Sequence, residues 1–291
     1  MGYSLPNLDI SKQLPHLREV IAKHELGAKR SLGQHYLLDT NLIRRIVREV
    51  GDTKNKILFE VGPGPGGLTR ALLETDAEQL FTIERDSRCI AALSDLTKCY
   101  SNRLTVIEAD ALNFKLKEIT KNNKITIVAN LPYNISIPLL LGWLRQLNLI
   151  NSMTLMFQKE VAERLIAKPG SKNYGRISVI SQWLCYVEKK LSIPPTAFVP
   201  PPKVNSALVN FIPRPQPISP ISFEIMEKVT AAAFGQRRKM LKSSLASLFS
   251  DPLKILKFLN INPAARAETL KVNEFCRISE HYIDLNKSEN Q

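Results

Sequence analysis

The chain has 291 residues, and its 40 Lys and Arg exceed its 27 Asp and Glu to give a formal net charge of +13 at pH 7. Such an excess of positive charge favours a polyanionic partner, with nucleic acid ahead of an anionic membrane surface. The four cysteines and four histidines lack the paired spacing of a zinc site, so we expect no metal centre and reduced thiols.

Hydropathy argues against a membrane-spanning segment. The most apolar stretch, residues 135–150, is interrupted by polar and charged residues and a proline, whereas a span needs about 20 apolar residues. The first residues also lack the basic-then-apolar pattern of a secretory signal. We therefore expect a cytoplasmic protein, monomeric and without membrane contact.

The first 50 residues are expected to form an arm followed by a helix. Apolar spacing in residues 42–50 indicates the helix. Asp39 or Thr40 is placed to cap it, because short polar side chains at this position accept hydrogen bonds from the first free N–H groups. In the arm, the adjacent cations Lys29 and Arg30 are candidate contacts to nucleic-acid phosphates.

A pattern typical of nucleotide-binding units follows. Residues 56–61 have the pattern of a short buried strand, the next loop contains Gly62, Gly64 and Gly67, and residues 68–74 have helical spacing. Glycines let the backbone approach a ligand closely, and the helix N-terminus comes directly after them. The same glycines satisfy the loose dinucleotide fingerprint, so an NAD-dependent oxidoreductase is an alternative at this point.

Three acidic residues end successive expected strands. Glu60 precedes the glycines, and a carboxylate there suits a cationic ligand better than a pyrophosphate. Glu84 stands where a ribose-binding acid is expected, and Asp110 can hydrogen-bond an adenine edge. A sulfonium carrying an amino-acid tail and an adenosine would use all three acids, whereas a dinucleotide would not.

The segment Asn130-Leu131-Pro132-Tyr133 follows the apolar strand pattern of residues 125–129. The Asn130 amide oxygen can accept from an exocyclic amine, and Tyr133 supplies a flat face for stacking a base. These groups could hold an adenine N6 amino group. An ordinary strand-to-turn exit is the alternative interpretation of the four residues.

The rest of the chain continues the alternation and then becomes helical. Further strands are expected at 153–157, 183–193 and 207–212, with a helix at 159–167 and a basic loop at 168–175. The proline-rich residues 213–220 indicate a stiff linker, and helices are expected at 223–234, 237–249, 253–259 and 272–285. We therefore predict an arm and helix (1–50), a main domain (51–215) and a helical C-terminal domain (216–291).

A basic cluster stands at the start of the helix expected at 237–249. It consists of Arg237, Arg238, Lys239 and Lys242. Cations at a helix N-terminus oppose the helix dipole, and this unfavourable placement favours contact with nucleic-acid phosphates over a merely solvated face.

Taken in order, the motifs resemble the class I S-adenosylmethionine-dependent methyltransferases. Within that class the chain is similar to the small-subunit (16S) rRNA adenine N6,N6-dimethyltransferases, the dimethyladenosine transferase family linked to kasugamycin sensitivity. The resemblance covers residues 28–285 and rests on Lys29–Asp39, Glu60–Thr69, Glu84, Asp110–Ala111, Asn130–Ile135, Pro201–Leu208, Phe234–Leu241 and Arg266–Leu270.

Two departures from the family pattern are visible. The usual Gly-Gln-Asn-Phe-Leu is Gly-Gln-His-Tyr-Leu at residues 33–37, so His35 replaces an asparagine. The Val-Asn-Ser at residues 204–206 replaces the commoner Val-Asp-Ser and is similar to the 23S rRNA antibiotic-resistance methylases.

The resemblance implies an α/β fold of the Rossmann-like type. Its sheet would have seven mostly parallel strands with an antiparallel pair at the end, and a small all-α domain would follow. The methyl donor would be S-adenosylmethionine, and the residues implied to bind it are His35, Leu37, Glu60, Gly62, Gly64, Glu84, Asp110 and Asn130. In this assignment Glu84 holds the ribose hydroxyls, Asp110 the adenine amino group, and Glu60 lies near the methionine amine.

The catalytic residues implied are Asn130, Leu131 and Tyr133. The Asn130 side chain and the Leu131 carbonyl would accept hydrogen bonds from N6 of the target adenosine while Tyr133 stacks on its base. The implied activity is dimethylation of N6 in two adjacent adenosines near the 3′ end of 16S rRNA. The partner would be the small ribosomal subunit or its precursor, during ribosome biogenesis.

Two further alternatives belong to the same class of fold. One is a 23S rRNA adenine N6-methyltransferase that confers antibiotic resistance, against which the Arg266–Leu270 segment argues. The other is a non-enzymatic nucleic-acid-binding relative such as a mitochondrial transcription factor. The intact Asn130–Tyr133 segment and the lack of a transit-peptide pattern argue against it.

Overall fold

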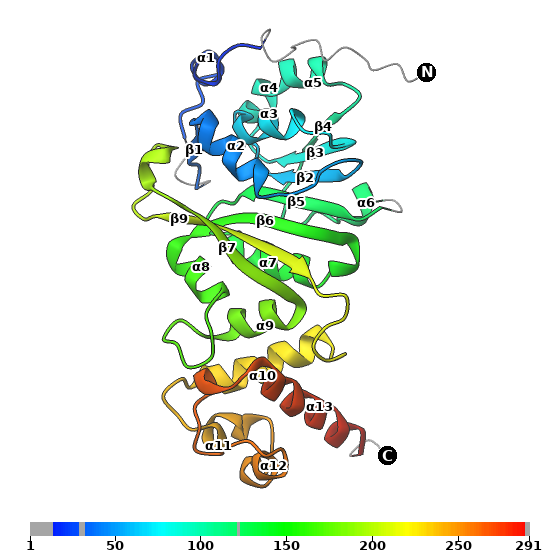
Figure 1. The fold of residues 1–291 in the computed structure, drawn as a ribbon, viewed down its shortest axis with the longest axis vertical. Helices are drawn as coiled ribbons and strands as arrows, with labels where there is room; N and C mark the ends of the chain where they lie inside the picture. The colour runs from blue at the N-terminus through cyan, green and yellow to red at the C-terminus, as the bar shows by residue number, and fades with distance from the viewer. Residues whose placement is uncertain (1–13, 29–32, 121–122, 289–291) are drawn as a thin grey trace. The chain divides into compact units, whose positions relative to one another are not determined.

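The computed structural model of the chain describes residues 14–28, 33–120 and 123–288 (Figure 1). Contacts divide the described chain into two units. The first comprises the residues up to Gln158 together with Lys190–Asn210. The second comprises Lys159–Lys189 and the residues from Phe211 onward.

The first unit contains the expected alternation of strands and helices. Its strands are β1 (Tyr36–Leu37), β2 (Ile57–Val61), β3 (Gln79–Glu84), β4 (Leu104–Glu108), β5 (Ile125–Asn130), β6 (Ile150–Gln158) and β8 (Phe198–Val199). Its helices are α1 (Leu17–Lys23), α2 (Thr40–Arg48), α3 (Gly67–Leu73), α4 (Ser87–Ala92), α5 (Ser94–Cys99), α6 (Lys117–Thr120) and α7 (Ser136–Leu144).

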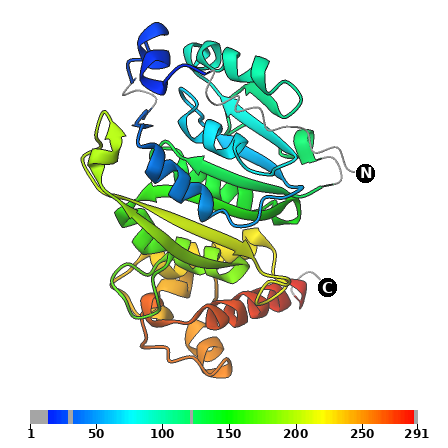
Figure 2. The same cartoon turned by 45° about the horizontal axis from the view of Figure 1, so that its top comes forward.

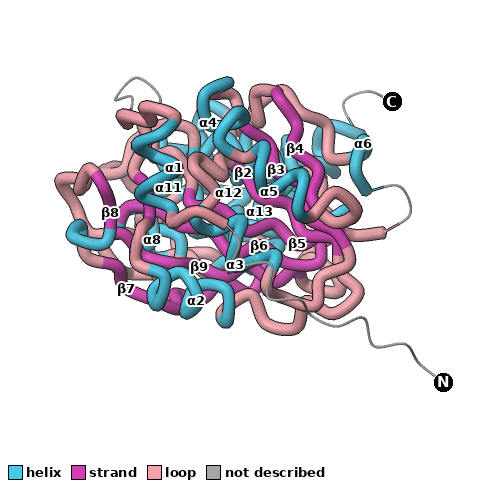
Figure 3. The backbone as a smooth tube through the Cα atoms, turned by 90° about the horizontal axis from the view of Figure 1, so that it is seen from above, coloured by secondary structure: helices cyan, strands magenta, loops and turns pink. Residues whose placement is uncertain are grey.

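The main sheet has seven strands in the order β4-β3-β2-β5-β6-β9-β7, where β7 is Cys185–Ile193 and β9 is Ser206–Pro213. Parallel pairing joins β2 to both β3 and β5, β3 to β4, and β5 to β6. Figure 3 shows β2, β3 and β4 side by side. The mostly parallel, seven-stranded α/β sheet is therefore confirmed, and the carboxyl ends of its parallel strands meet at one edge.

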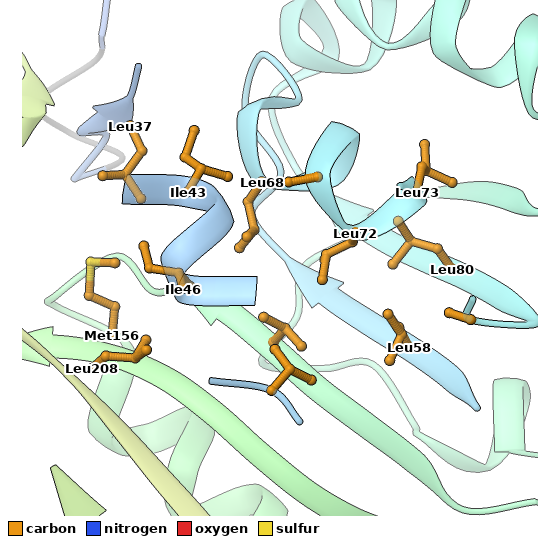
Figure 4. Close-up of a cluster of buried hydrophobic side chains, with 14 of the residues drawn as sticks. Leu37, Ile43, Ile46, Leu58, Leu68, Leu72, Leu73, Leu80, Met156 and Leu208 are labelled. Carbon is orange, nitrogen blue, oxygen red and sulfur yellow. The ribbon is translucent and has the colours of Figure 1, made fainter. Parts of the chain in front are cut away.

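One face of this sheet is covered by α2 and α3 (Figure 2). Ile43 and Ile46 of α2 pack in a buried cluster with Leu68 and Leu72 of α3 and with Leu58 of β2 (Figure 4). Ile43 and Ile46 are three residues apart, and Leu68 and Leu72 are four residues apart, so each pair lies on one side of its helix. Burial of this apolar face holds the glycine loop, which lies between β2 and α3, against the sheet.

The predicted start of α2 is confirmed. Asp39 is the N-cap residue, and its side chain accepts hydrogen bonds from the N–H groups of Asn41 and Leu42. This cap fixes the point at which the arm turns into the helix. The short strand β1, three residues earlier, pairs antiparallel with β8 and brings residues 36 and 37 to the edge of the main sheet's ligand side.

The second unit is built from helices. They are α8 (Lys159–Leu165), α9 (Arg176–Leu184), α10 (Phe223–Gly235), α11 (Leu241–Ser244), η5 (Leu245–Ser247), α12 (Pro252–Phe258), η6 (Ala267–Thr269) and α13 (Val272–Ser288). Phe234 of α10 stacks on Phe275 of α13 with ring centroids 5.5 Å apart. This pair joins the two longest helices of the unit.

Two expected elements were wrong. The strand expected from residue 183 begins at Cys185, because Trp183 and Leu184 still belong to α9, which the sequence patterns did not reveal. The helix expected at 237–249 begins only at Leu241. A helix starting at 237 would need the Leu241 N–H to donate backward along the chain, but it donates to the Ala265 carbonyl at 2.8 Å.

Candidate active site

A cavity lies at the carboxyl ends of β2, β3, β4 and β5 in the first unit, and the arm residues 33–37 also line it. All the residues predicted to be catalytic or cofactor-binding line this cavity: His35, Leu37, Glu60, Gly62, Gly64, Glu84, Asp110, Asn130, Leu131 and Tyr133. The fold thus brings together residues that are far apart in the sequence. Their individual roles remain predictions.

The glycine loop presents backbone to the cavity. Gly62 and Gly64 have φ values of +70° and +54°, in the left-handed region that favours glycine. A Cβ atom on Gly64 would lie 3.0 Å from Cε1 of Tyr36 in the arm. A side chain at position 64 would therefore both strain the backbone and push the arm away from the loop.

Glu84, at the end of β3, is held in place by three backbone N–H groups. Its Oε2 accepts from Gly64 at 3.1 Å, and its Oε1 accepts from Arg85 and Asp86 at 2.8 and 2.9 Å. Burial raises the pKa of this carboxyl, while the three N–H donors act in the opposite direction. A carboxylate accepts about four hydrogen bonds, so Glu84 retains capacity for a ligand hydroxyl.

The Glu60 carboxyl group is buried, and one of its oxygens lacks a hydrogen-bond partner among the residues that the structure describes. Its side chain is 1 % exposed, and its Oε2 has no hydrogen-bond partner within the described part of the chain. Burial raises its pKa from 4.5 to about 8. The Thr69 hydroxyl acts in the opposite direction, and the negative charge of Glu84 acts in the same direction as burial. A cationic group on a ligand would supply both the missing partner and the missing countercharge. Glu60 is therefore suited to a cationic ligand group, and its predicted place beside the amine of S-adenosylmethionine stays a prediction.

Asp110 follows β4 on the same edge of the sheet. Its Oδ1 accepts from the N–H of Leu112 at 3.0 Å, and its Oδ2 lies 3.4 Å from Nη1 of Arg85. The Arg85 side chain is 70 % exposed, so this ion pair is weak and screened by solvent. A hydrogen-bond donor on a ligand can therefore replace the guanidinium at Asp110 at little cost, and the contact with an adenine amino group stays a prediction.

Asn130 is oriented by the arm. Its Nδ2 donates to the backbone carbonyl of His35 at 3.0 Å. This bond distinguishes the two ends of the amide and leaves Oδ1 as its acceptor. The neighbouring Leu131 carbonyl receives no hydrogen bond from a backbone N–H of the described residues. No hydrogen bond from the described residues to either of the two acceptors predicted for an adenine N6 is found.

Tyr133 is fixed at its hydroxyl and on its ring. The hydroxyl lies 2.6 Å from Oγ of Ser206 and forms a hydrogen bond with it. The ring stacks on that of His35, with centroids 5.8 Å apart and an interplanar angle of 27°. Burial raises the pKa of the Tyr133 hydroxyl above its ordinary value, while the hydrogen bond with Ser206 acts in the opposite direction.

Two polar residues of this region were not predicted. One is Ser206, which anchors Tyr133. The other is Gln34, which donates to Asp86 at 3.0 Å and accepts from the Tyr36 hydroxyl at 2.9 Å. Both lie inside the segments that carried the family resemblance, but their partners, just after β5 and at the start of α4, are 73 and 52 residues away.

Among the residues that the structure describes, those predicted to contact RNA do not line the cavity described above. Lys29 and Arg30 lie outside the described residues. Arg237, Arg238 and Lys239 follow the C-terminus of α10 rather than starting a helix. Cations there are favoured by the helix dipole, so the argument from unfavourable placement was wrong.

Arg237 has an intramolecular role. Its Nε donates to Glu268 at 3.0 Å, and its Nη2 donates to the carbonyls of Lys172 and Tyr174. These bonds hold the loop between α8 and α9 to the segment around η6. Arg238, Lys239 and Lys242 are exposed, and their contact with RNA stays a prediction.

Comparison with known proteins identifies the family. A family model described as ribosomal RNA adenine dimethylase matches residues 26–284. The chain is 50 % identical over 266 residues to "Ribosomal RNA small subunit methyltransferase A" of Rhodospirillum rubrum, covering 91 % of this chain and 92 % of that protein. The protein of the same name from Paramagnetospirillum magneticum is 52 % identical, with 91 % and 94 % covered.

The chain belongs to the ribosomal RNA adenine dimethylase family. A crystal structure of a dimethyladenosine transferase from Plasmodium falciparum is similar, with a TM-score of 0.76, 28 % identity, and coverage of 86 % of this chain and 98 % of that one. The 23S rRNA methyltransferase ErmE has a TM-score of 0.65 at 23 % identity, with 85 % and 99 % covered, and shares the fold. The α/β fold of this dimethylase is thus shared with rRNA methyltransferases.

Proposed function

We propose that this chain transfers methyl groups from S-adenosylmethionine to N6 of two adjacent adenosines near the 3′ end of 16S rRNA, within the small ribosomal subunit or its precursor. The observation that carries the proposal is one cavity with two sets of groups. Glu60, Glu84 and Asp110 suit the binding of a cationic compound that contains adenosine. Asn130 and Tyr133 suit the binding of a second adenine in the same cavity. Small-subunit rRNA is favoured over 23S rRNA by the names of the relatives near 50 % identity.

The cavity fits the methyl donor through the buried Glu60. When bound, S-adenosylmethionine supplies an electrophilic methyl group on its sulfonium. Glu60 would release its proton to solvent and pair with the amine of the amino-acid tail, and Glu84 would accept from the ribose hydroxyls. Asp110 would accept from the adenine amino group in place of Arg85. His35 and Leu37 of the arm close the cavity.

The second set of groups holds the target adenosine. A base inside a folded RNA must leave its stack before N6 can enter the cavity, and Tyr133 offers a flat face on which it can stack again. Oδ1 of Asn130 and the Leu131 carbonyl then accept from N6. These bonds draw the nitrogen lone pair out of conjugation with the ring and direct it toward the methyl group.

Orientation and electrostatics supply most of the catalysis in this proposal. A strong base is unnecessary, because N6 becomes acidic when it is alkylated and its proton passes to solvent. The monomethylated nitrogen retains one N–H, so it can use only one of the two acceptors at a time. The cavity must therefore accept N6 twice in different orientations.

The wider assignments are also proposals. The enzyme would act as a monomer in the cytoplasm, with residues 1–50 completing the cofactor cavity, 51–215 forming the catalytic domain and 216–291 forming a helical domain that contacts RNA. Exposed Arg238, Lys239 and Lys242 supply cations for that contact, and the +13 charge supports it. Among the helices described, none has the length and apolarity needed to cross a bilayer.

Mapping of modified adenosines in cells tests the proposal. Small-subunit rRNA from cells that contain the protein should carry dimethyladenosine at two neighbouring positions near the 3′ end, and cells lacking the gene should have unmodified adenosine there. Identical modification in the two strains would contradict the proposed function.

A further inference from the structure

His35 contacts both groups that would handle the target base. Its backbone carbonyl accepts the hydrogen bond from Nδ2 of Asn130 at 3.0 Å. Its imidazole ring stacks on Tyr133 at a centroid separation of 5.8 Å. One arm residue thus meets the predicted N6 acceptor through its backbone and the predicted stacking face through its side chain.

The imidazole ring is itself held in one orientation. Nδ1 lies 2.8 Å from the carbonyl oxygen of Pro200, and because a carbonyl can only accept, Nδ1 carries the proton and donates it. The ring also meets the edge of the buried Phe198, with centroids 6.5 Å apart and an interplanar angle of 77°. These two contacts hold the His35 ring in place beside Tyr133.

Within the described residues, none of the hydrogen bonds or aromatic contacts of the imidazole involves Glu60, Glu84 or Asp110. The hydrogen bond and both aromatic contacts of the imidazole involve Pro200, Phe198 and Tyr133. The asparagine that is usual in the family at this position has no ring with which to stack on a tyrosine. The replacement of asparagine by histidine therefore adds a contact to the base-handling side.

We infer that His35 is a positioning residue for the target adenine, an inference that rests on the proposed function. Its ring packs against the Tyr133 ring in an offset stack, while Ser206 holds the tyrosine hydroxyl at 2.6 Å. The Tyr133 side chain is thus held at both its ring and its hydroxyl. A tyrosine immobilised before substrate arrives loses less side-chain freedom when the base binds.

Three substitutions at position 35 separate this role from a cofactor contact. His35→Ala and His35→Asn remove the stacking ring but keep the backbone carbonyl that orients Asn130. His35→Phe keeps a flat ring and removes the Nδ1 donor. Small subunits isolated from cells lacking the enzyme serve as the substrate, and calorimetry measures S-adenosylmethionine binding separately.

We expect His35→Ala and His35→Asn to lower kcat/KM for the particles about twofold to tenfold, the range that an aromatic pair supplies. Their dissociation constants for S-adenosylmethionine should stay within about twofold of the wild type. His35→Phe should restore most of kcat/KM. Weaker S-adenosylmethionine binding with unchanged kcat/KM for the particles would overturn the inference and assign His35 to the cofactor.

A double-mutant cycle checks whether His35 acts through Tyr133. In a Tyr133→Ala background the additional His35→Ala change should have no further effect on single-turnover methylation. An equal loss in both backgrounds would overturn the inference. Failure of the proposed function itself gives a different result, because the wild-type protein would then methylate no small-subunit particles.

Discussion

Replacing Glu60 with glutamine should stabilise the ligand-free protein and weaken its cofactor binding. The pKa of Glu60 is raised from 4.5 to about 8 by burial, so the folded state holds a proton that the unfolded state releases above pH 4.5. The part of the free energy of unfolding that depends on protonated Glu60 is therefore fully present below pH 4.5, and it is lost as the pH rises toward 8. At pH 7 the loss is about 3 kcal/mol, at about 1.36 kcal/mol per pH unit.

Glutamine cannot ionise, so Glu60→Gln should avoid this loss. We expect the variant to be more stable than the wild type at pH 7 in denaturant unfolding, by up to about 3 kcal/mol. The difference should shrink as the pH is lowered toward 4.5. S-adenosylmethionine binding should weaken by about 1.5 to 3 kcal/mol, because a charge-assisted hydrogen bond to the amine is lost.

Proton release provides an independent check. A wild-type Glu60 that is mostly protonated at pH 7 must lose close to one proton when it pairs with a cation. Calorimetry in buffers of different ionisation enthalpy should detect this proton in the wild type and not in Glu60→Gln. The reasoning is refuted if the variant is less stable at pH 7, releases the same number of protons and binds S-adenosylmethionine as tightly as the wild type.

Three further predictions concern the target base and the RNA. Asn130→Ala should lose nearly all methylation in kinetic assays yet keep S-adenosylmethionine binding, because the bonds to N6 matter most in the transition state. Tyr133→Phe should keep substantial activity, since the stacking face survives, whereas Tyr133→Ala should lose most of it. Replacing Arg238 and Lys239 together should weaken binding to small-subunit particles and reduce the slope of log affinity against log salt by about 1.5, because each lost phosphate contact releases fewer counterions.

Each of these has a contradicting outcome. An Asn130→Ala enzyme with normal turnover would remove that amide from the reaction. Comparable activities of the two Tyr133 variants would show that the ring face is not used. An unchanged salt slope would mean that Arg238 and Lys239 are only solvated surface charges. An Arg237→Ala variant serves as a control, because it loosens the loop between α8 and α9 instead.

The parts of the site that depend on local pattern could be predicted from the sequence. Asp39 caps α2 as expected, since capping involves residues only two and three positions away. Glu60, Glu84 and Asp110 meet at one edge because each lies at or just after the carboxyl end of a parallel strand, and the carboxyl ends of such strands are neighbours. Strand patterns and the resemblance were enough to place all three in one cavity.

The parts that depend on distant partners could not be predicted. The helix expected from residue 237 starts at Leu241 because that N–H finds the Ala265 carbonyl. Charge alone made Arg237 a phosphate contact, whereas the fold uses it to bind Glu268 and two loop carbonyls. The stacking of His35 on Tyr133 joins residues almost 100 positions apart, and no local periodicity indicates such a contact.

The most direct test of the central claim is methylation in vitro of both ribosomal subunits. Purified protein and S-adenosylmethionine are incubated with small or large subunits from cells lacking the enzyme, with Asn130→Ala as the control, and the RNA is digested and analysed by mass spectrometry. The account predicts N6,N6-dimethyladenosine at two neighbouring positions of the small-subunit RNA, monomethyladenosine only in transit, and neither product with the control. Stable monomethyladenosine as the end product, or methylation of the large-subunit RNA instead, would contradict it.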